Sequence, residues 1–285
     1  MARTKKNTPL EQAKLQQATL AAVSASKNKV KLKRKKPFFT ATNFYPWAIE
    51  ANVTQWLEKQ FKKVATYYKE LALAGIKDDA EQLEKAQEFS FGAEFQLELE
   101  NFFNEINSFA LKAQENFEVK TIGRTIGNYV PTKELKENFV KTFVANCESA
   151  SVEQKKKIAE LVYKHRMFPE QSESLVEQIN NVNKNFTKKQ AKFIARNETE
   201  NVNGALMRER QTQAGFDCYQ WMTMMDGAVR ESHRALNGMV CKWSNPNVYS
   251  EDGGKTWKKR KASMYIGQPC QDYNCRCTAL PFDLD

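Results

Sequence analysis

The chain has 285 residues, of which 41% are hydrophobic and 27% are charged, and its formal net charge is +10. This length and composition predict a soluble globular protein of one to two domains that buries a full core. No stretch approaches the roughly 18 apolar residues that a membrane span needs, and the amino terminus lacks the apolar region of a secretory signal, so neither class of protein is expected.

The excess positive charge lies in one segment at the amino terminus. Residues 1–36 contain 11 Lys or Arg and a single acid, Glu11, so they carry +10, and the rest of the chain, with 33 basic and 33 acidic residues, is neutral. Seven of these basic residues fall within ten positions: Lys27, Lys29, Lys31, Lys33, Arg34, Lys35 and Lys36. Runs of like charge resist folding and attract phosphate backbones. We predict a flexible, disordered basic arm that binds DNA without sequence preference or binds an acidic protein surface, the alternative being a solubilising tail without a partner.

Residues 37–186 are predicted to form a helical scaffold domain. Pro46 suits the first turn of a helix, apolar residues recur at steps of three and four from Ile49 to Leu71, and Gly75 suits its end. A second helical stretch is predicted over residues 79–116, with an interruption at Gly92. Both stripes are typical of packing faces rather than ligand sites.

Capping chemistry predicts the next helix starts. Ser151-x-x-Gln154 and Thr187-x-x-Gln190 both fit a capping box, in which the two side chains satisfy each other's backbone amides. Between them, a helix is expected over residues 169–181, and a loop or short strand is expected earlier, over residues 118–131, with helix resuming at Thr132. His165 falls near a predicted helix end and is given a structural role.

Residues 187–285 change in character and are predicted to form a small α+β domain. The predicted elements are a helix over 187–214, a strand over 218–225, a short helix over 228–236, a hairpin with its turn at 251–255, and a strand over 275–282. The whole chain is therefore predicted to be α+β, with a mostly helical amino-terminal region.

Polar and ligating residues are concentrated in this last domain, at positions 221–238 and 274–277. On one helix, Asp226, Arg230 and His233 would share a face, and on one strand Cys275 and Cys277 would share a face. These two thiols with His233 could bind a structural zinc ion. The candidates for a fourth ligand are Cys270, Cys241 and Asp226.

Two other interpretations of the same residues stay open. In the first, Asp226, Arg230 and His233 form a structural polar network beside buried free cysteines, since four of the six cysteines fall between residues 241 and 277 without a disulfide framework. In the second, a cysteine is a nucleophile with His233 as its base, which would also need an orienting group and an oxyanion hole.

These residues also resemble a known family. Their landmarks are Arg196-x-Glu198, then Trp221-x4-Asp226-x3-Arg230-x2-His233-x2-Leu236-x-Gly238, and Pro269 ahead of Asn274-Cys275-Arg276-Cys277. In this order they resemble the phage Mu F-like head morphogenesis family of minor capsid proteins, over residues 187–285. The resemblance implies a Mu F-like carboxyl-terminal domain.

The resemblance also implies a location and partners. A member of this family is expected in the virion, in the capsid interior near the portal, and in the host cytoplasm during assembly. Its expected partners are the portal protein, other capsid or scaffold subunits and packaged DNA. Some members have cysteines where Arg230 and His233 stand, which implies a metal site with Cys275 and Cys277. Arg230 cannot be a ligand, and Cys270 stands where the family pattern has Gly, so it is a candidate replacement.

The sequence therefore predicts a non-enzymatic phage minor head protein that acts in head morphogenesis and DNA packaging or delivery. The alternatives are a DNA- or metal-binding protein unrelated to capsids, and a hydrolase that uses Cys275 or Cys277 with His233.

Overall fold

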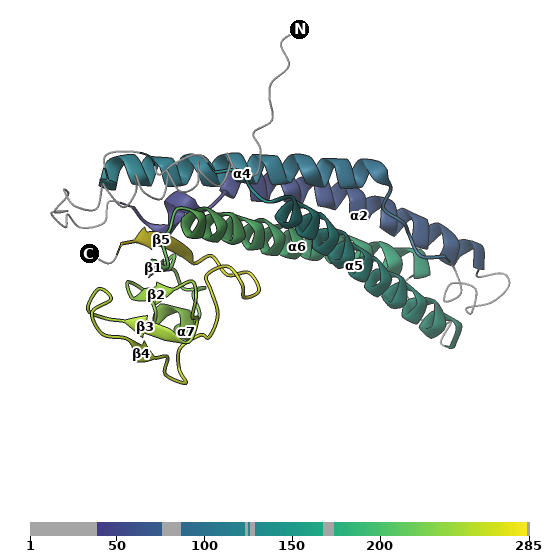
Figure 1. Ribbon diagram of the computed structural model, residues 1–285. Coiled ribbons are helices and arrows are strands. Elements are labelled where there is room, and N and C mark those ends of the chain that lie inside the picture. Colours follow the sequence, from purple (N-terminus) through teal and green to yellow (C-terminus); the bar gives the residue numbers. More distant parts are fainter. Residues whose placement is uncertain (1–38, 76–86, 123–124, 126–128, 168–173, 284–285) are drawn as a thin grey trace, which may run out of the picture. The chain divides into compact units, whose positions relative to one another are not determined.

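The computed structural model describes residues 39–75, 87–122, 125, 129–167 and 174–283 (Figure 1). The predicted basic arm, with Lys27 to Lys36, lies outside these residues. Within them, the predicted α+β fold class is confirmed: long helices come first, and a small antiparallel sheet lies at the carboxyl end of the chain. No described helix combines the length and hydropathy that are needed to cross a bilayer.

The helices and strands follow each other in two blocks. The helices are η1 (Ala41–Phe44), α2 (Trp47–Gly75), α4 (Ala93–Ile122), α5 (Lys133–Met167), α6 (Leu175–Gln213) and α7 (Glu231–Arg234). The strands are β1 (Cys218–Met222), β2 (Val240–Lys242), β3 (Val248–Ser250), β4 (Lys258–Lys259) and β5 (Thr278–Phe282).

Contacts divide the described residues into two compact units. The sheet unit takes its residues from Met1–Tyr45, Asn107–Pro131 and Asn203–Asp285, and the helical unit takes the remainder, Pro46–Ile106 and Thr132–Val202. Helices α4 and α6 therefore contribute residues to both units. The division proposed from the sequence, at residues 1–36, 37–186 and 187–285, stays a prediction.

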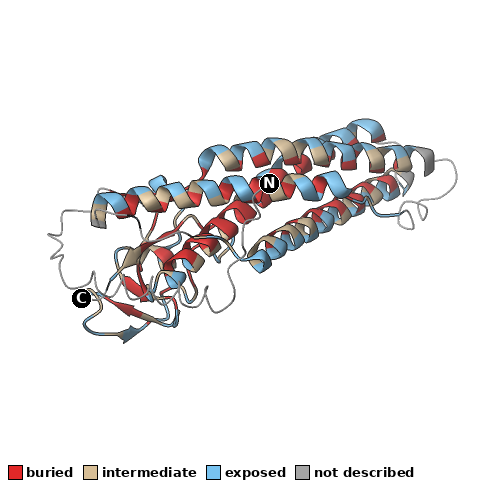
Figure 2. Ribbon diagram, turned by 45° about the horizontal axis from the view of Figure 1, so that its top comes forward, coloured by how far each residue is buried: buried red, intermediate tan, exposed pale blue. Residues whose placement is uncertain are grey.

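The first predicted helix is confirmed as α2. The residues of its apolar stripe are each at most 1% exposed: Val53, Leu57, Phe61, Val64 and Tyr68. Figure 2 shows buried residues concentrated along one side of the long helices, as an amphipathic pattern requires. In the helical unit, α2 packs against α5.

The two predicted helix starts at capping boxes are wrong. Ser151 lies inside α5 and Thr187 inside α6, so the helices predicted over 169–181 and 187–214 are one element. Ser151 is buried and its hydroxyl is hydrogen bonded to the Tyr68 hydroxyl at 3.2 Å. A tertiary contact thus satisfies a side chain whose local pattern is typical of a helix start.

Of the second predicted helix, residues 79–86 lie outside the described residues and residues 87–92 are not helical, so the helix begins with α4 directly after Gly92. Its other end is wrong, because α4 continues to Ile122 through a stretch predicted as loop or strand. The reason is a buried ion pair in the sheet unit: Nη2 of Arg210 donates to both oxygens of Glu118, at 2.9 and 3.1 Å, and both side chains are 3% exposed. This contact holds the last turns of α4 in a helical conformation.

The sheet has five antiparallel strands in the order β4-β3-β2-β1-β5. The predicted hairpin is confirmed as β3 and β4, although its second strand is Lys258–Lys259 rather than Thr256–Trp257. The longest pairing joins β1 to β5, from Cys218 opposite Phe282 to Met222 opposite Thr278. Large aromatic side chains make up much of the core on this sheet: Tyr219, Trp221, Trp243 and Tyr249.

Candidate metal centre

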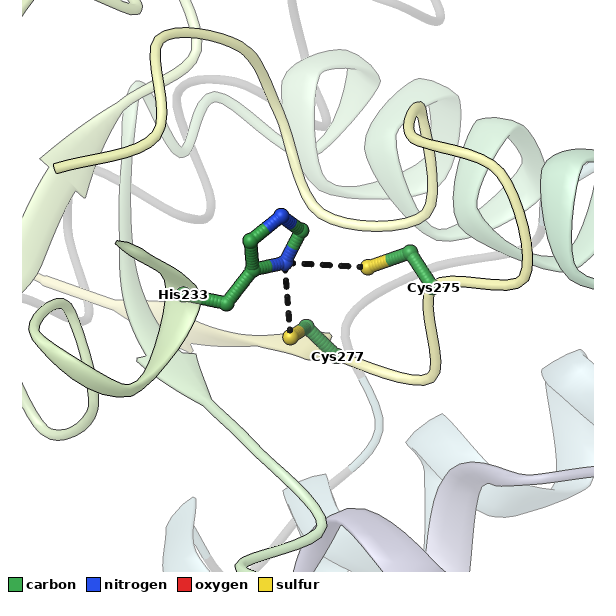
Figure 3. A group of neighbouring side chains, drawn as sticks. All are labelled: His233, Cys275 and Cys277. Atoms are coloured by element: carbon green, nitrogen blue, oxygen red, sulfur yellow. Dashed lines mark hydrogen bonds between the residues drawn. The ribbon is translucent and has the colours of Figure 1, made fainter. Parts of the chain in front are cut away.

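Three side chains of ligand type converge beside the sheet. His233 lies in α7, whereas Cys275 and Cys277 lie in the segment that leads into β5 (Figure 3). Each of the two Sγ atoms lies 3.5 Å from Nδ1 of His233, and the three ligand atoms lie within 4.8 Å of one another. All three residues are 2–3% exposed. Their donor set, one imidazole and two thiols, is the one that zinc prefers.

The local geometry that produces this convergence differs from the predicted geometry. The helix predicted over 228–236 is only Glu231–Arg234, so Asp226 and Arg230 precede it and do not share a helical face with His233. The strand predicted over 275–282 begins at Thr278, so strand alternation does not bring the two sulfur atoms together.

A turn positions both thiols instead. Cys270 and Asn274 have φ angles of 66° and 53°, in the left-handed region that few residues other than Gly adopt. Gln268 fixes the start of this turn to the sheet unit, because its side-chain amide donates to the backbone carbonyls of Lys242 and Trp243, at 3.2 and 3.1 Å. The turn is therefore held by hydrogen bonds to strand β2 and to the residue after it.

The far side of the His233 ring contacts a carboxylate that the sequence analysis missed. Nε2 of His233 lies 3.2 Å from Oδ2 of Asp272. A carboxylate in this position favours the tautomer with the proton on Nε2, in which the lone pair of Nδ1 faces the two sulfur atoms. The available signal was position, since Asp272 is the single acid between Pro269 and Cys277.

Arg230 supports Asp272 from the outside. Its Nη1 lies 3.3 Å from Oδ2 of Asp272, and its Nη2 donates to the carbonyl of Tyr273 at 2.8 Å. Asp226 does not take part in this contact, because it pairs with Arg276 at 2.7 Å and accepts from the amide of Ala228. Of the predicted polar network, Arg230 and His233 are linked through Asp272, whereas Asp226 belongs to a separate ion pair.

Aromatic rings fix the imidazole in the remaining directions. The ring of Tyr265 is stacked on His233, with centroids 4.4 Å apart. Trp221 meets the same ring edge-on at 5.8 Å. His233 is therefore held by packing as well as by its hydrogen bonds, so its lone pair has a fixed direction.

The other proposed ligands do not join the cluster among the described residues. The thiol of Cys270 donates to the carbonyl of Cys277 at 2.9 Å. Cys241 is buried in the aromatic core, where burial raises the pKa of its thiol. None of the six cysteines, all of which are described, forms a disulfide.

The pKa values of the two converging thiols are shifted in opposite directions. The pKa of Cys275 is held well below its usual value, mainly because Cys277 donates a hydrogen bond to it, against the effect of burial. The pKa of Cys277 is raised by the same hydrogen bond and by burial.

The Arg196-x-Glu198 motif has a structural role in the helical unit. Nε of Arg196 pairs with Glu50 at 3.1 Å, and Glu198 accepts hydrogen bonds from the amide groups of Asn146 and Asn197, both at 2.9 Å. Burial raises the pKa of Glu198, and the two hydrogen bonds oppose the rise. These contacts join α6 to α2 and α5.

The site combines the buried imidazole of α7 with two thiols from the turn before β5, beside a small antiparallel sheet. The protein is thus of the class that has an α+β domain with a candidate structural metal centre. Residues 148–280 match the sequence profile of the family described as Phage Mu protein F like protein. This match confirms the resemblance over these residues and indicates a phage head-related protein.

One curated relative matches part of the chain. The chain is 31% identical over 110 residues to an uncharacterized protein of Haemophilus influenzae. The alignment covers 39% of this chain and 21% of that protein, so the chain spans about a fifth of the length of its relative. No solved structure matches the chain.

Substitution of Gly204 tests how closely α6 packs against the turn that carries Cys275 and Cys277. A Cβ atom at this position of α6 would lie 2.4 Å from Cβ and 3.0 Å from Sγ of Cys270. We expect Gly204→Ala to lower the free energy of unfolding, because overpacking costs about 1–3 kcal/mol and the gain in helix propensity is at most about 1 kcal/mol. Urea unfolding measures the difference. Gly227→Ala, where the added atom meets open space, is the control, and equal stability of both variants would contradict the packing.

Proposed function

We propose that the protein is a non-enzymatic minor component of the phage head, acting in head morphogenesis and in DNA packaging or delivery. The family match over residues 148–280 carries this proposal. In the assembled virion the protein lies in the capsid interior near the portal, and it contacts the portal protein and other capsid or scaffold subunits through its helices.

The basic arm supplies the contact with nucleic acid in this proposal. Its +10 charge over residues 1–36 suits the phosphate backbone, whose neutralisation releases counterions and needs no base contacts. The seven basic residues from Lys27 to Lys36 carry most of this charge. The same positive charge also suits an acidic surface on a portal or scaffold subunit, which is the alternative partner of the arm.

A hydrolase is the second candidate, and one observation favours it. Cys275, His233 and Asp272 stand in the order nucleophile, base and orienting group. Two features oppose it: Cys275 is only 3% exposed, whereas reactive thiols need access, and a second sulfur lies equally close to the same nitrogen. We therefore rank the head protein first.

Co-purification tests the proposed location. We expect the full chain, produced together with the portal and capsid proteins of its phage, to remain with the assembled heads through sedimentation at high salt. A variant lacking residues 1–36 serves as the control for contacts that depend on charge alone, and it should also remain. Absence of the full chain from purified heads would argue for a DNA- or metal-binding protein unrelated to capsids.

Deletion of the arm tests the DNA contact. We expect removal of residues 1–36 to lower retention of double-stranded DNA at least tenfold at low salt, because nearly all of the excess charge is lost. Filter binding at several salt concentrations measures the effect, and retention by the full chain should fall steeply as salt rises. A matched variant with Gln at the seven basic positions keeps the length of the arm. Unchanged retention in both variants would remove DNA from the role of the arm.

A further inference from the structure

We propose that Nδ1 of His233 and the Sγ atoms of Cys275 and Cys277 bind one zinc ion, and that Asp272 and Arg230 are positioning residues for His233. This inference goes beyond the proposed role in the phage head and does not depend on it. It rests on the distances between the ligand atoms, on the single lone pair of Nδ1 and on the contacts around the imidazole.

The distances between ligand atoms match a tetrahedral ion. With Zn–S bonds of about 2.3 Å and a Zn–N bond of about 2.0 Å, the sulfur and nitrogen corners of a tetrahedron lie about 3.5 Å apart. Both sulfur atoms lie 3.5 Å from Nδ1. Both sulfur-to-nitrogen distances thus match those of a tetrahedral site, and the two Sγ atoms lie within 4.8 Å of each other. The fourth position is left for a solvent molecule or a group from outside the described residues.

Hydrogen bonding alone explains the arrangement less well. Nδ1 of a neutral imidazole has a single lone pair, so it accepts one good hydrogen bond, but two sulfur atoms lie at the same distance from it. A nucleophile and its base would need only one of them. A metal ion uses the lone pair of the nitrogen and one lone pair of each thiolate, so it gives every one of the three atoms a partner.

The contacts around the imidazole are those of a metal ligand. Metal-binding histidines usually donate their other ring N–H to a carboxylate, which fixes the tautomer and raises the basicity of the ligating nitrogen. Asp272 occupies this position at 3.2 Å. Arg230 pairs with the same carboxylate oxygen at 3.3 Å and with the carbonyl of Tyr273, so it orients Asp272 although it cannot bind a metal itself.

The bound ion would join two segments that are far apart in sequence. His233 comes from α7, before β2, and the thiols come from the turn before β5. These segments contact each other through the cluster, through Asp272 and through the packing of Trp221 and Tyr265 on the imidazole. Zinc would therefore stabilise the folded sheet unit, because the ligands are not preorganised in the unfolded chain.

Metal titration of the full chain tests the ligand set. After removal of metal with a chelator, we expect the protein to take up about one Zn²⁺ per chain. The double variant Cys275→Ser, Cys277→Ser should lose this uptake, and Cys218→Ser, a buried thiol of the same unit, should keep it. Failure of the stripped wild-type chain to retain zinc, or equal zinc in the double variant, would overturn the proposal.

A spectroscopic measurement separates loss of ligands from loss of folding. Co²⁺ added to the stripped wild-type chain should give a thiolate-to-metal charge-transfer band, which reports Co–S bonds directly. We expect His233→Ala to weaken and alter this spectrum, and His165→Ala, which removes the other histidine, to leave it unchanged. A wild-type spectrum without the thiolate band would overturn the site even if the protein bound metal elsewhere.

The role of Asp272 is tested separately. We expect Asp272→Asn to weaken zinc binding about 10- to 100-fold without changing the stoichiometry, since partners of this kind act through the orientation of the ligand. Competition with a chelator measures affinity, and Asp272→Glu should restore part of it. Asp226→Asn, which alters the ion pair with Arg276 instead, is the matched control. Equal zinc affinity of Asp272→Asn and wild type would remove the positioning role.

Discussion

The register of β1 between β2 and β5 is the constraint on which the candidate centre depends. Strand β1 pairs with β2 at Gln220 opposite Val240 and with β5 at Met222 opposite Thr278. Both partners therefore begin beside the carboxyl end of β1. The residues just before each of them, α7 in one case and the turn with the two thiols in the other, are brought to the same end of the same strand.

Side-chain packing then completes what the strand register begins. Trp221 exchanges backbone hydrogen bonds with Met239 and Gly238, and its indole lies against the imidazole of His233. A shift of β5 by one residue would move Cys277 away from this end and turn the alternating side chains of the strand to the opposite face. Register and ligand geometry are thus specified by the same backbone contacts.

The fold could be predicted from the sequence wherever local pattern and tertiary packing agree. The stripe of α2 satisfies both, and so do the α+β class and the hairpin near residue 251. The prediction failed where a distant partner overrides the local signal. Ser151 is hydrogen bonded to Tyr68, and Glu118 forms an ion pair with Arg210. The two stretches around Ser151 and Glu118 therefore remain helical, although their local sequence suggests an interruption.

The candidate site was predictable as a set of residues but not as a geometry. The density of His and Cys pointed to His233, Cys275 and Cys277, and these three do converge. Their approach depends on a turn with two positive φ angles, for which Cys270 and Asn274 gave no clear signal. Asp272 was missed because sequence spacing shows potential ligands and does not show which carboxylate faces the back of an imidazole.

Charge balance explains why Arg230 belongs to such a centre although it cannot be a ligand. Two thiolates neutralise one zinc ion, so the first group of atoms would carry no net charge. Asp272 adds a negative charge beside a nearly fully buried imidazole, and an unpaired charge in that environment is costly. Arg230 cancels it through the same oxygen that contacts His233. With zinc bound, the ion and its ligands would form one neutral group and the Asp272–Arg230 pair another, so the carboxylate could orient the imidazole without leaving a net charge at the site.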